Sequence, residues 1–169
     1  MQLAHALRYA GRLGEAEAAA ARGAKLAAAS KDGALMIAAL CAQGELVLAR
    51  GAAKAALLIF ARARGLSELG GERLSVLPLA GLAAAQARLG HAVKAQQNAE
   101  KALARARAAQ EPVGEVRSLA ALAAATGERA PLREAVMLAE RLPHRPLAAQ
   151  LRRQLATLGD ARDSDGSAS

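Results

Sequence analysis

Apolar positions recur every three or four residues along most of the chain, and glycines or prolines interrupt the pattern at intervals. This spacing is typical of amphipathic helices. The interruptions leave a short first segment and eight helical segments, which we predict at 15–29, 34–50, 52–64, 73–89, 91–109, 113–126, 132–142 and 147–158. Because the turns are short, consecutive helices are expected to run antiparallel. We expect a loop or a frayed turn at 65–72 and a disordered tail at 159–169.

The composition restricts the fold class. Hydrophobic residues make up 53% of the chain but aromatic residues only 1%, so the core must consist mainly of alanine and leucine. These two residues are strong helix formers, whereas the β-branched residues that favour strands are scarce. The sequence therefore predicts an all-α protein.

The helical segments repeat with a period of about 40 residues when the chain is aligned on Gly11, Gly51, Gly90 and Ala130. The fifth residue after each anchor is alanine, and the ninth is alanine or phenylalanine. These positions are Ala16, Ala56, Ala95 and Ala135, then Ala20, Phe60, Ala99 and Ala139. A stripe of small side chains lets a second helix approach closely.

This pattern resembles the tetratricopeptide repeat family, whose signature places small residues around a glycine at the hairpin turn. The matching residues are Gly44, Gly51, Ala56, Phe60 and Ala63 in one unit and Ala83, Gly90, Ala95, Ala99 and Ala102 in the next. The fourth unit lacks the glycine at the turn. The period is similar to the longer repeats of MalT-type bacterial regulators, and the resemblance covers residues 2–158.

The resemblance implies an α-solenoid of about four antiparallel helical hairpins within residues 1–158, closed by a capping helix at 145–158. The last helix fits a cap because Leu147, Leu151, Leu155 and Leu158 share one face, while Arg145, Arg152 and Arg153 lie off it. A cap with one apolar and one charged face covers the otherwise exposed end of a repeat array.

The formal net charge is +8, which is compatible with nucleic acid, an anionic membrane or an acidic partner. We interpret it as a solvated surface. The single cysteine, Cys41, excludes an intrachain disulfide and fits a reducing cytoplasm. The longest apolar run, at 34–42, is shorter than the roughly 20 residues that span a bilayer, so we expect no membrane partner and a cytoplasmic location.

Candidate catalytic chemistry is sparse. The histidines His5, His91 and His144 are far apart in sequence, and no two of them have the i, i+4 spacing of a helical metal site. Cys41 stands alone in an apolar run, and no glycine-rich phosphate loop is complete. We therefore expect no catalytic residues, no cofactor and no metal, and hence not an enzyme.

Two groups of cations were considered as a phosphate-binding ridge. Lys101, Arg105 and Arg107 lie near one side of a helix, and Arg62 and Arg64 are placed similarly one repeat earlier. The chain has one tyrosine, one phenylalanine and no tryptophan, so side chains that stack on bases are scarce. Nucleic-acid binding is thus an alternative that we do not favour.

The resemblance also implies a concave groove lined by the first helix of each hairpin. Its expected residues are His5, Arg8, Tyr9, Cys41, Glu45, Leu48, Leu77, Ala84, Arg88, Arg117 and Ala124. Most are small or apolar, so the expected guest is a helix or an apolar segment. The alternative is that these residues merely pack against the flanking repeat.

Together these patterns predict a non-catalytic protein-interaction scaffold. The resemblance implies the sensor or interaction domain of a larger bacterial transcriptional or signalling regulator. One alternative is a self-associating fragment that forms a homodimer through its open N-terminal edge. The other is the basic nucleic-acid-binding solenoid.

Overall fold

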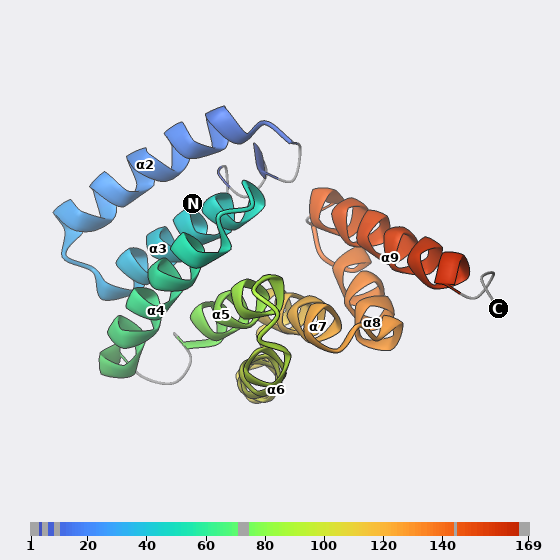
Figure 1. Ribbon diagram of the computed structural model, residues 1–169. Helices are drawn as coiled ribbons and strands as arrows, with labels where there is room; N and C mark the ends of the chain where they lie inside the picture. Colours follow the sequence, from blue (N-terminus) through green and yellow to red (C-terminus); the bar gives the residue numbers. More distant parts are fainter. Residues whose placement is uncertain (1–3, 5–6, 9–10, 71–74, 144, 166–169) are drawn as a thin grey trace.

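The computed structural model describes residues 4, 7–8, 11–70, 75–143 and 145–165, and all secondary structure in these residues is helical. The eight helices are α2 (Leu13–Ser30), α3 (Gly33–Ala49), α4 (Ala53–Gly70), α5 (Val76–Arg88), α6 (Ala92–Ala108), α7 (Pro112–Thr126), α8 (Arg129–Glu140) and α9 (Arg145–Asp165). Each helix packs on the next one along the chain, and α5 also packs on α3 and α7. The all-α prediction is confirmed, and Figure 1 shows the helices arranged along an arc.

Four glycines with positive φ mark equivalent turns. Each lies two residues before a helix, and they are Gly11, Gly51, Gly90 and Gly127, with φ of 77°, 84°, 77° and 72°. Glycine adopts this conformation without the steric cost that a Cβ would impose. The fourth turn was expected at Ala130, without a glycine, but Ala130 lies inside α8. The helix starts earlier because Pro131 falls in its first turn, where a missing N–H costs little.

The small-residue stripes of the second helices form the core. Ala56, Phe60 and Ala63 on α4 are completely buried, as are Ala95, Ala99 and Ala102 on α6. The ring of Phe60 lies against two glycines: a Cβ added to Gly44 on α3 would come within 2.7 Å of it, and one on Gly81 of α5 within 2.2 Å. The close packing of α3, α4 and α5 therefore depends on these glycines.

Two helices are longer than predicted. The loop expected at 65–72 is helical up to Gly70, because Leu66 packs against the core and Ser67 is fully buried. The Ser67 hydroxyl donates to the Arg64 carbonyl at 2.7 Å, so it needs no outside partner. Residues 71–72 lie outside the described part.

The tail predicted from residue 159 is likewise helical as far as Asp165, and residues 166–169 lie outside the described part. Extending an existing helix adds one hydrogen bond per residue without a new nucleation cost, so α9 continues beyond its last partly buried leucine, Leu158.

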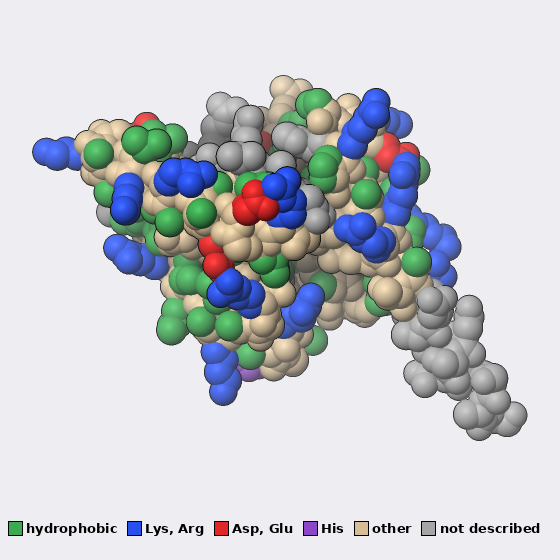
Figure 2. Space-filling model, turned by 90° about the horizontal axis from the view of Figure 1, so that it is seen from above, with side chains coloured by type: hydrophobic (Ala, Val, Ile, Leu, Met, Phe, Trp, Pro, Cys, Tyr) green, Lys and Arg blue, Asp and Glu red, His purple; other side chains and the backbone are tan. Residues whose placement is uncertain are grey.

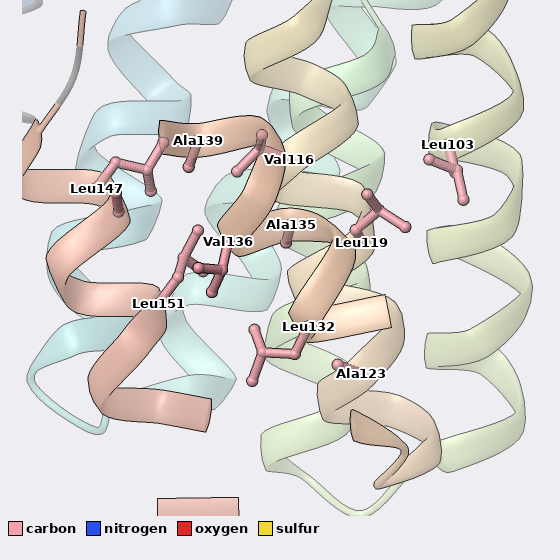
Figure 3. Packing of buried hydrophobic residues seen from close by; sticks show 11 residues of the cluster. Leu103, Val116, Leu119, Ala123, Leu132, Ala135, Val136, Ala139, Leu147 and Leu151 are labelled. Atoms are coloured by element: carbon pink, nitrogen blue, oxygen red, sulfur yellow. The ribbon is translucent and has the colours of Figure 1, made fainter. Parts of the chain in front are cut away.

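The largest core cluster joins α6, α7, α8 and α9 (Figure 3). Leu147 and Leu151 of α9 are buried against it, together with Val116 of α7 and Leu132 of α8. Leu155 and Leu158 are partly buried on the same face, while Arg152 on the outer side pairs with Glu140 of α8 at 2.6 Å. The structure thus confirms the apolar and charged faces predicted for the last helix.

Within the described ranges, none of the helices combines the length and apolar character needed to cross a bilayer.

Candidate functional site

A cavity with a volume of about 480 Å³ lies between the first helices of the hairpins and α9. Residues of α3, α5, α7 and α9 make up most of its lining, together with Arg8; α4 and α8 contribute one residue each, and α2 and α6 contribute none. Its walls are largely aliphatic, formed by Leu48, Leu77, Ala80, Ala84, Val116, Ala120, Leu147, Leu151 and Leu158. The packing of alternate helices thus leaves one apolar hollow on the inner side of the arc.

Most residues predicted for the groove line this cavity. They are Arg8, Glu45, Leu48, Leu77, Ala84, Arg88, Arg117 and Ala124. His5 and Tyr9 lie outside the described residues. The structure therefore brings Arg8 together with side chains from α3, α5 and α7, which the resemblance to tetratricopeptide repeats had grouped in one groove.

Cys41 is the exception, because it does not line the cavity. It is buried in the core cluster with Ile37, Ala56 and Phe60. Burial, with a smaller effect of the nearby Glu45 carboxylate, raises the pKa of the Cys41 thiol to about 12. Position in the repeat placed Cys41 on the groove side of α3, but α4 and α5 cover this turn of the helix.

An ion-pair network joins three of the cavity-lining residues. Arg8 and Arg117 both contact Glu45, at 2.8 Å and 2.5 Å, and all three side chains are only 13–16% exposed. Arg117 and Glu45 are 72 residues apart in sequence, so the network ties the second hairpin to the fourth. Two guanidinium groups share this one carboxylate, so the three described side chains together carry a net positive charge.

Arg88 adds a further positive charge to the lining. It belongs to α5, is exposed, and forms no ion pair with any residue that the structure describes. Among the lining residues that the structure describes, Glu45 is the only carboxylate, against the three arginines. The cavity therefore combines aliphatic walls with an excess of positive charge.

The helix α9 also lines the cavity, although its sequence pattern predicts only a cap. This helix lines the cavity with Leu147, Leu151 and Leu158 and also with Gln150, Gln154 and Thr157, which recur at i, i+4 and i+7. The leucine spacing was recognised, but it was assigned only to capping. Nothing in the local sequence shows that the same face extends over the hollow, because this depends on how α8 directs the chain.

The ridge of cations considered for phosphate binding is largely occupied by other contacts. Arg64 pairs with Glu68, Arg105 bonds to the hydroxyl of Ser75, and Arg107 pairs with two glutamates. The hydrogen bond between the Arg107 side chain and Glu115 raises the pKa of Arg107. The guanidinium group of Arg107 therefore stays charged and bound to Glu115. The five residues therefore do not form one free basic surface.

No group of three potential metal ligands occurs among the described histidine, cysteine and acidic residues. His91 is exposed directly before α6, while His5 and His144 lie outside the described residues. Compared with known proteins, the chain matches no family model and no curated protein.

Proposed function

We propose that this chain is a tetratricopeptide-like α-solenoid that binds a segment of a partner protein in its inner cavity, without catalysis. The observation that carries the proposal is the cavity itself, which the first helices of successive hairpins build with aliphatic walls and excess arginine. The recurring glycine turns and the period near 40 residues support the repeat assignment. Helical repeat proteins use such inner surfaces for partners.

The size of the cavity limits the guest. A volume of about 480 Å³ lies within the range of about 300–1,000 Å³ that holds a drug-sized ligand, so it accommodates a few large side chains rather than a folded domain. The guest is therefore a short helical or extended segment that inserts aliphatic side chains. Because the three arginines outnumber Glu45, the segment also carries a carboxylate on the side that faces Arg88.

We further propose that the chain acts as the interaction domain of a larger cytoplasmic bacterial regulator of transcription or signalling. The long repeat period and the arginine-rich composition support this assignment.

Two labelled helical peptides test the cavity. Both carry the same leucine face, and one is flanked by glutamates, the other by lysines. Fluorescence anisotropy with the full chain is expected to show tighter binding of the glutamate peptide, and Arg88→Glu is expected to abolish the preference. Equal binding of both peptides would contradict the proposed role of the arginines.

A matched pair of variants tests the location. Ala124 and Ala61 are both exposed alanines on helices, but only Ala124 lines the cavity. Ala124→Trp is expected to weaken peptide binding at least about tenfold by filling the hollow, whereas Ala61→Trp on α4 leaves it unchanged. Light scattering of the same samples would reveal a homodimer, in which a second copy rather than an external partner would supply the guest.

A further inference from the structure

The outer helices α2, α4, α6 and α8 use nearly all of their described carboxylates in contacts with arginine. Glu15, Glu17, Glu68, Glu134 and Glu140 each contact an arginine at 2.6–3.0 Å. Glu100 instead accepts a hydrogen bond from Gln96. Figure 2 looks at the molecule from the top of Figure 1, the side of α2 and α9, and on that face too acidic side chains are few and basic side chains project at many points. The acidic residues of these helices therefore offer little free negative charge to solvent.

A set of cations on these helices, or directly after one of them, forms no ion pair with the residues that the structure describes. We call Arg22, Lys25, Lys54, Arg62, Lys101 and Arg141 the outer cations: each is exposed, and none forms an ion pair with a described residue. On α4, Lys54 and Arg62 lie on the opposite side from the buried Phe60. The outer cations thus point away from the cavity and give the outside of the arc an uncompensated positive charge.

Each outer helix also exposes one large apolar side chain. These are Leu26, Leu58, Val93 and Met137, which are 56–72% exposed. Leu58 lies midway between Lys54 and Arg62 at i, i+4 and i+8, and Met137 lies one turn before Arg141. Single exposed apolar residues are common on soluble proteins. Here one occurs in each outer helix, and each lies within eight residues of an outer cation.

We propose that the outer helices dock on the surface of an anionic lipid bilayer. The outer cations are attracted by the negative surface potential, and the exposed apolar side chain of an outer helix that touches the membrane, such as Leu58 of α4, enters the boundary between headgroups and acyl chains. The absence of a segment long enough to span a bilayer argues against a membrane-spanning protein, but docking on the surface requires no spanning helix. This inference is independent of the function proposed for the cavity.

Two other partners fit these observations less well. A nucleic acid would use the cations, but it would gain nothing from exposed leucine and methionine, and Phe60, the single phenylalanine, is completely buried. A protein interface gathers apolar side chains at its centre and places charges at the rim. On the outer helices each apolar side chain stands alone among cations.

Sedimentation with lipid vesicles tests the proposal. The full chain is mixed with vesicles of phosphatidylcholine, or of phosphatidylcholine with phosphatidylglycerol, at low salt and at about half-molar salt, where the Debye length is only a few ångströms. We expect binding to the anionic vesicles at low salt, weaker binding at high salt, and none to the neutral vesicles. Absence of binding to the anionic vesicles at low salt would overturn the proposal.

Charge-reversal variants test whether vesicle binding depends on this surface or only on the net charge of the chain. Lys54→Glu with Arg62→Glu is expected to lower the bound fraction at least about tenfold. The matched control, Arg145→Glu with Arg153→Glu on α9, makes the same change in charge away from the outer helices and should retain binding. Equal losses in the two variants would refute a specific docking surface.

The variant Leu58→Ser tests the lipid contact without changing the charge. We expect this variant to bind the vesicles about threefold more weakly, or weaker still. Because Leu58 is exposed, the circular dichroism spectrum should stay unchanged. If vesicle binding is unaffected and duplex DNA binds more tightly than the vesicles at equal salt, the outer cations serve a nucleic-acid backbone instead, and the proposal is wrong.

Discussion

Glu45 on α3 accepts a hydrogen bond from Arg117 on α7 at 2.5 Å, although α5 packs between these two helices. The bond can form because the middle of α5 presents small residues to the cavity, namely Ala80, Gly81 and Ala84. Arg8 contacts the second oxygen of the same carboxylate. One glutamate thus links three of the hairpins on the inner side of the arc.

The first prediction concerns this carboxylate. Glu45→Gln preserves the shape of the side chain but leaves Arg8 and Arg117 without their shared counter-charge in a largely buried site. We expect the free energy of unfolding to fall by about 2–3 kcal/mol, measured by urea denaturation. As a control, Glu15→Gln removes the exposed pair with Arg12 and should cost less than about 1 kcal/mol. Similar losses of stability in both variants would show that the buried network stabilises the protein no more than an exposed ion pair does.

The second prediction concerns the contact of Gly81 with Phe60. In Gly81→Ala the added methyl group would lie 2.2 Å from the fully buried ring, so we expect a loss of about 3 kcal/mol or more in urea denaturation. Combining it with Phe60→Leu should cost less than the sum of the two single variants, because the smaller side chain makes room.

The matched glycine control is Gly65→Ala. Gly65 lies inside α4, and a Cβ there meets no atom within 4 Å. This substitution should stabilise the protein by about 0.5–1 kcal/mol, since alanine loses less conformational entropy in a helix. A destabilised Gly65→Ala protein would show that residues 65–70 form a loop, as the sequence alone suggested, and not a helix.

The third prediction follows from the buried thiol of Cys41. Because burial raises its pKa to about 12 from the usual 9.0, we expect no reaction with Ellman's reagent at pH 8 unless the chain is unfolded. Below pH 9 the folded and the unfolded chain both keep the Cys41 thiol proton, so this group does not change the free energy of unfolding. Between pH 9 and 12 the unfolded chain releases the proton while the folded chain retains it. Stability therefore falls by up to about 1.4 kcal/mol per pH unit.

Comparison with Cys41→Ala isolates this effect from the titration of lysines. The difference in unfolding free energy between the two proteins should change with pH only above about pH 9. A constant difference up to pH 12, or rapid labelling of the folded protein, would contradict the burial of the thiol.

The fourth prediction concerns the attachment of α9. Leu151 is buried in the C-terminal cluster, whereas Leu155 one turn later is only partly buried. We expect Leu151→Ala to cost about 2–4 kcal/mol in thermal or urea unfolding and Leu155→Ala clearly less. The reverse order would mean that the second half of α9, rather than the first, holds the helix to α8.

Much of the lining of the candidate site could be predicted, because the resemblance to tetratricopeptide repeats implies which positions of each first helix face the groove. Leu48, Ala84 and Arg117 were grouped by their place in the first helices, and the structure brings them to one cavity. Sequence reasoning misplaced Cys41, because periodicity gives the face of a helix but not how far its neighbours cover that face. It also missed Gln150, Gln154 and Thr157, since a cap and a cavity wall have the same local pattern.

The sequence by itself determined that this protein is helical and where most of its helices lie, because alanine-rich periodicity and breakers such as Gly51 and Gly90 act locally on the backbone. Only the tertiary structure decided that α4 continues through Ser67, since burial by neighbouring helices outweighs the glycines around that residue. The tertiary structure alone also decided that Glu45 pairs with Arg117. Coulomb attraction depends on the distance between the two groups in space, and a separation of 72 residues along the chain does not indicate that distance.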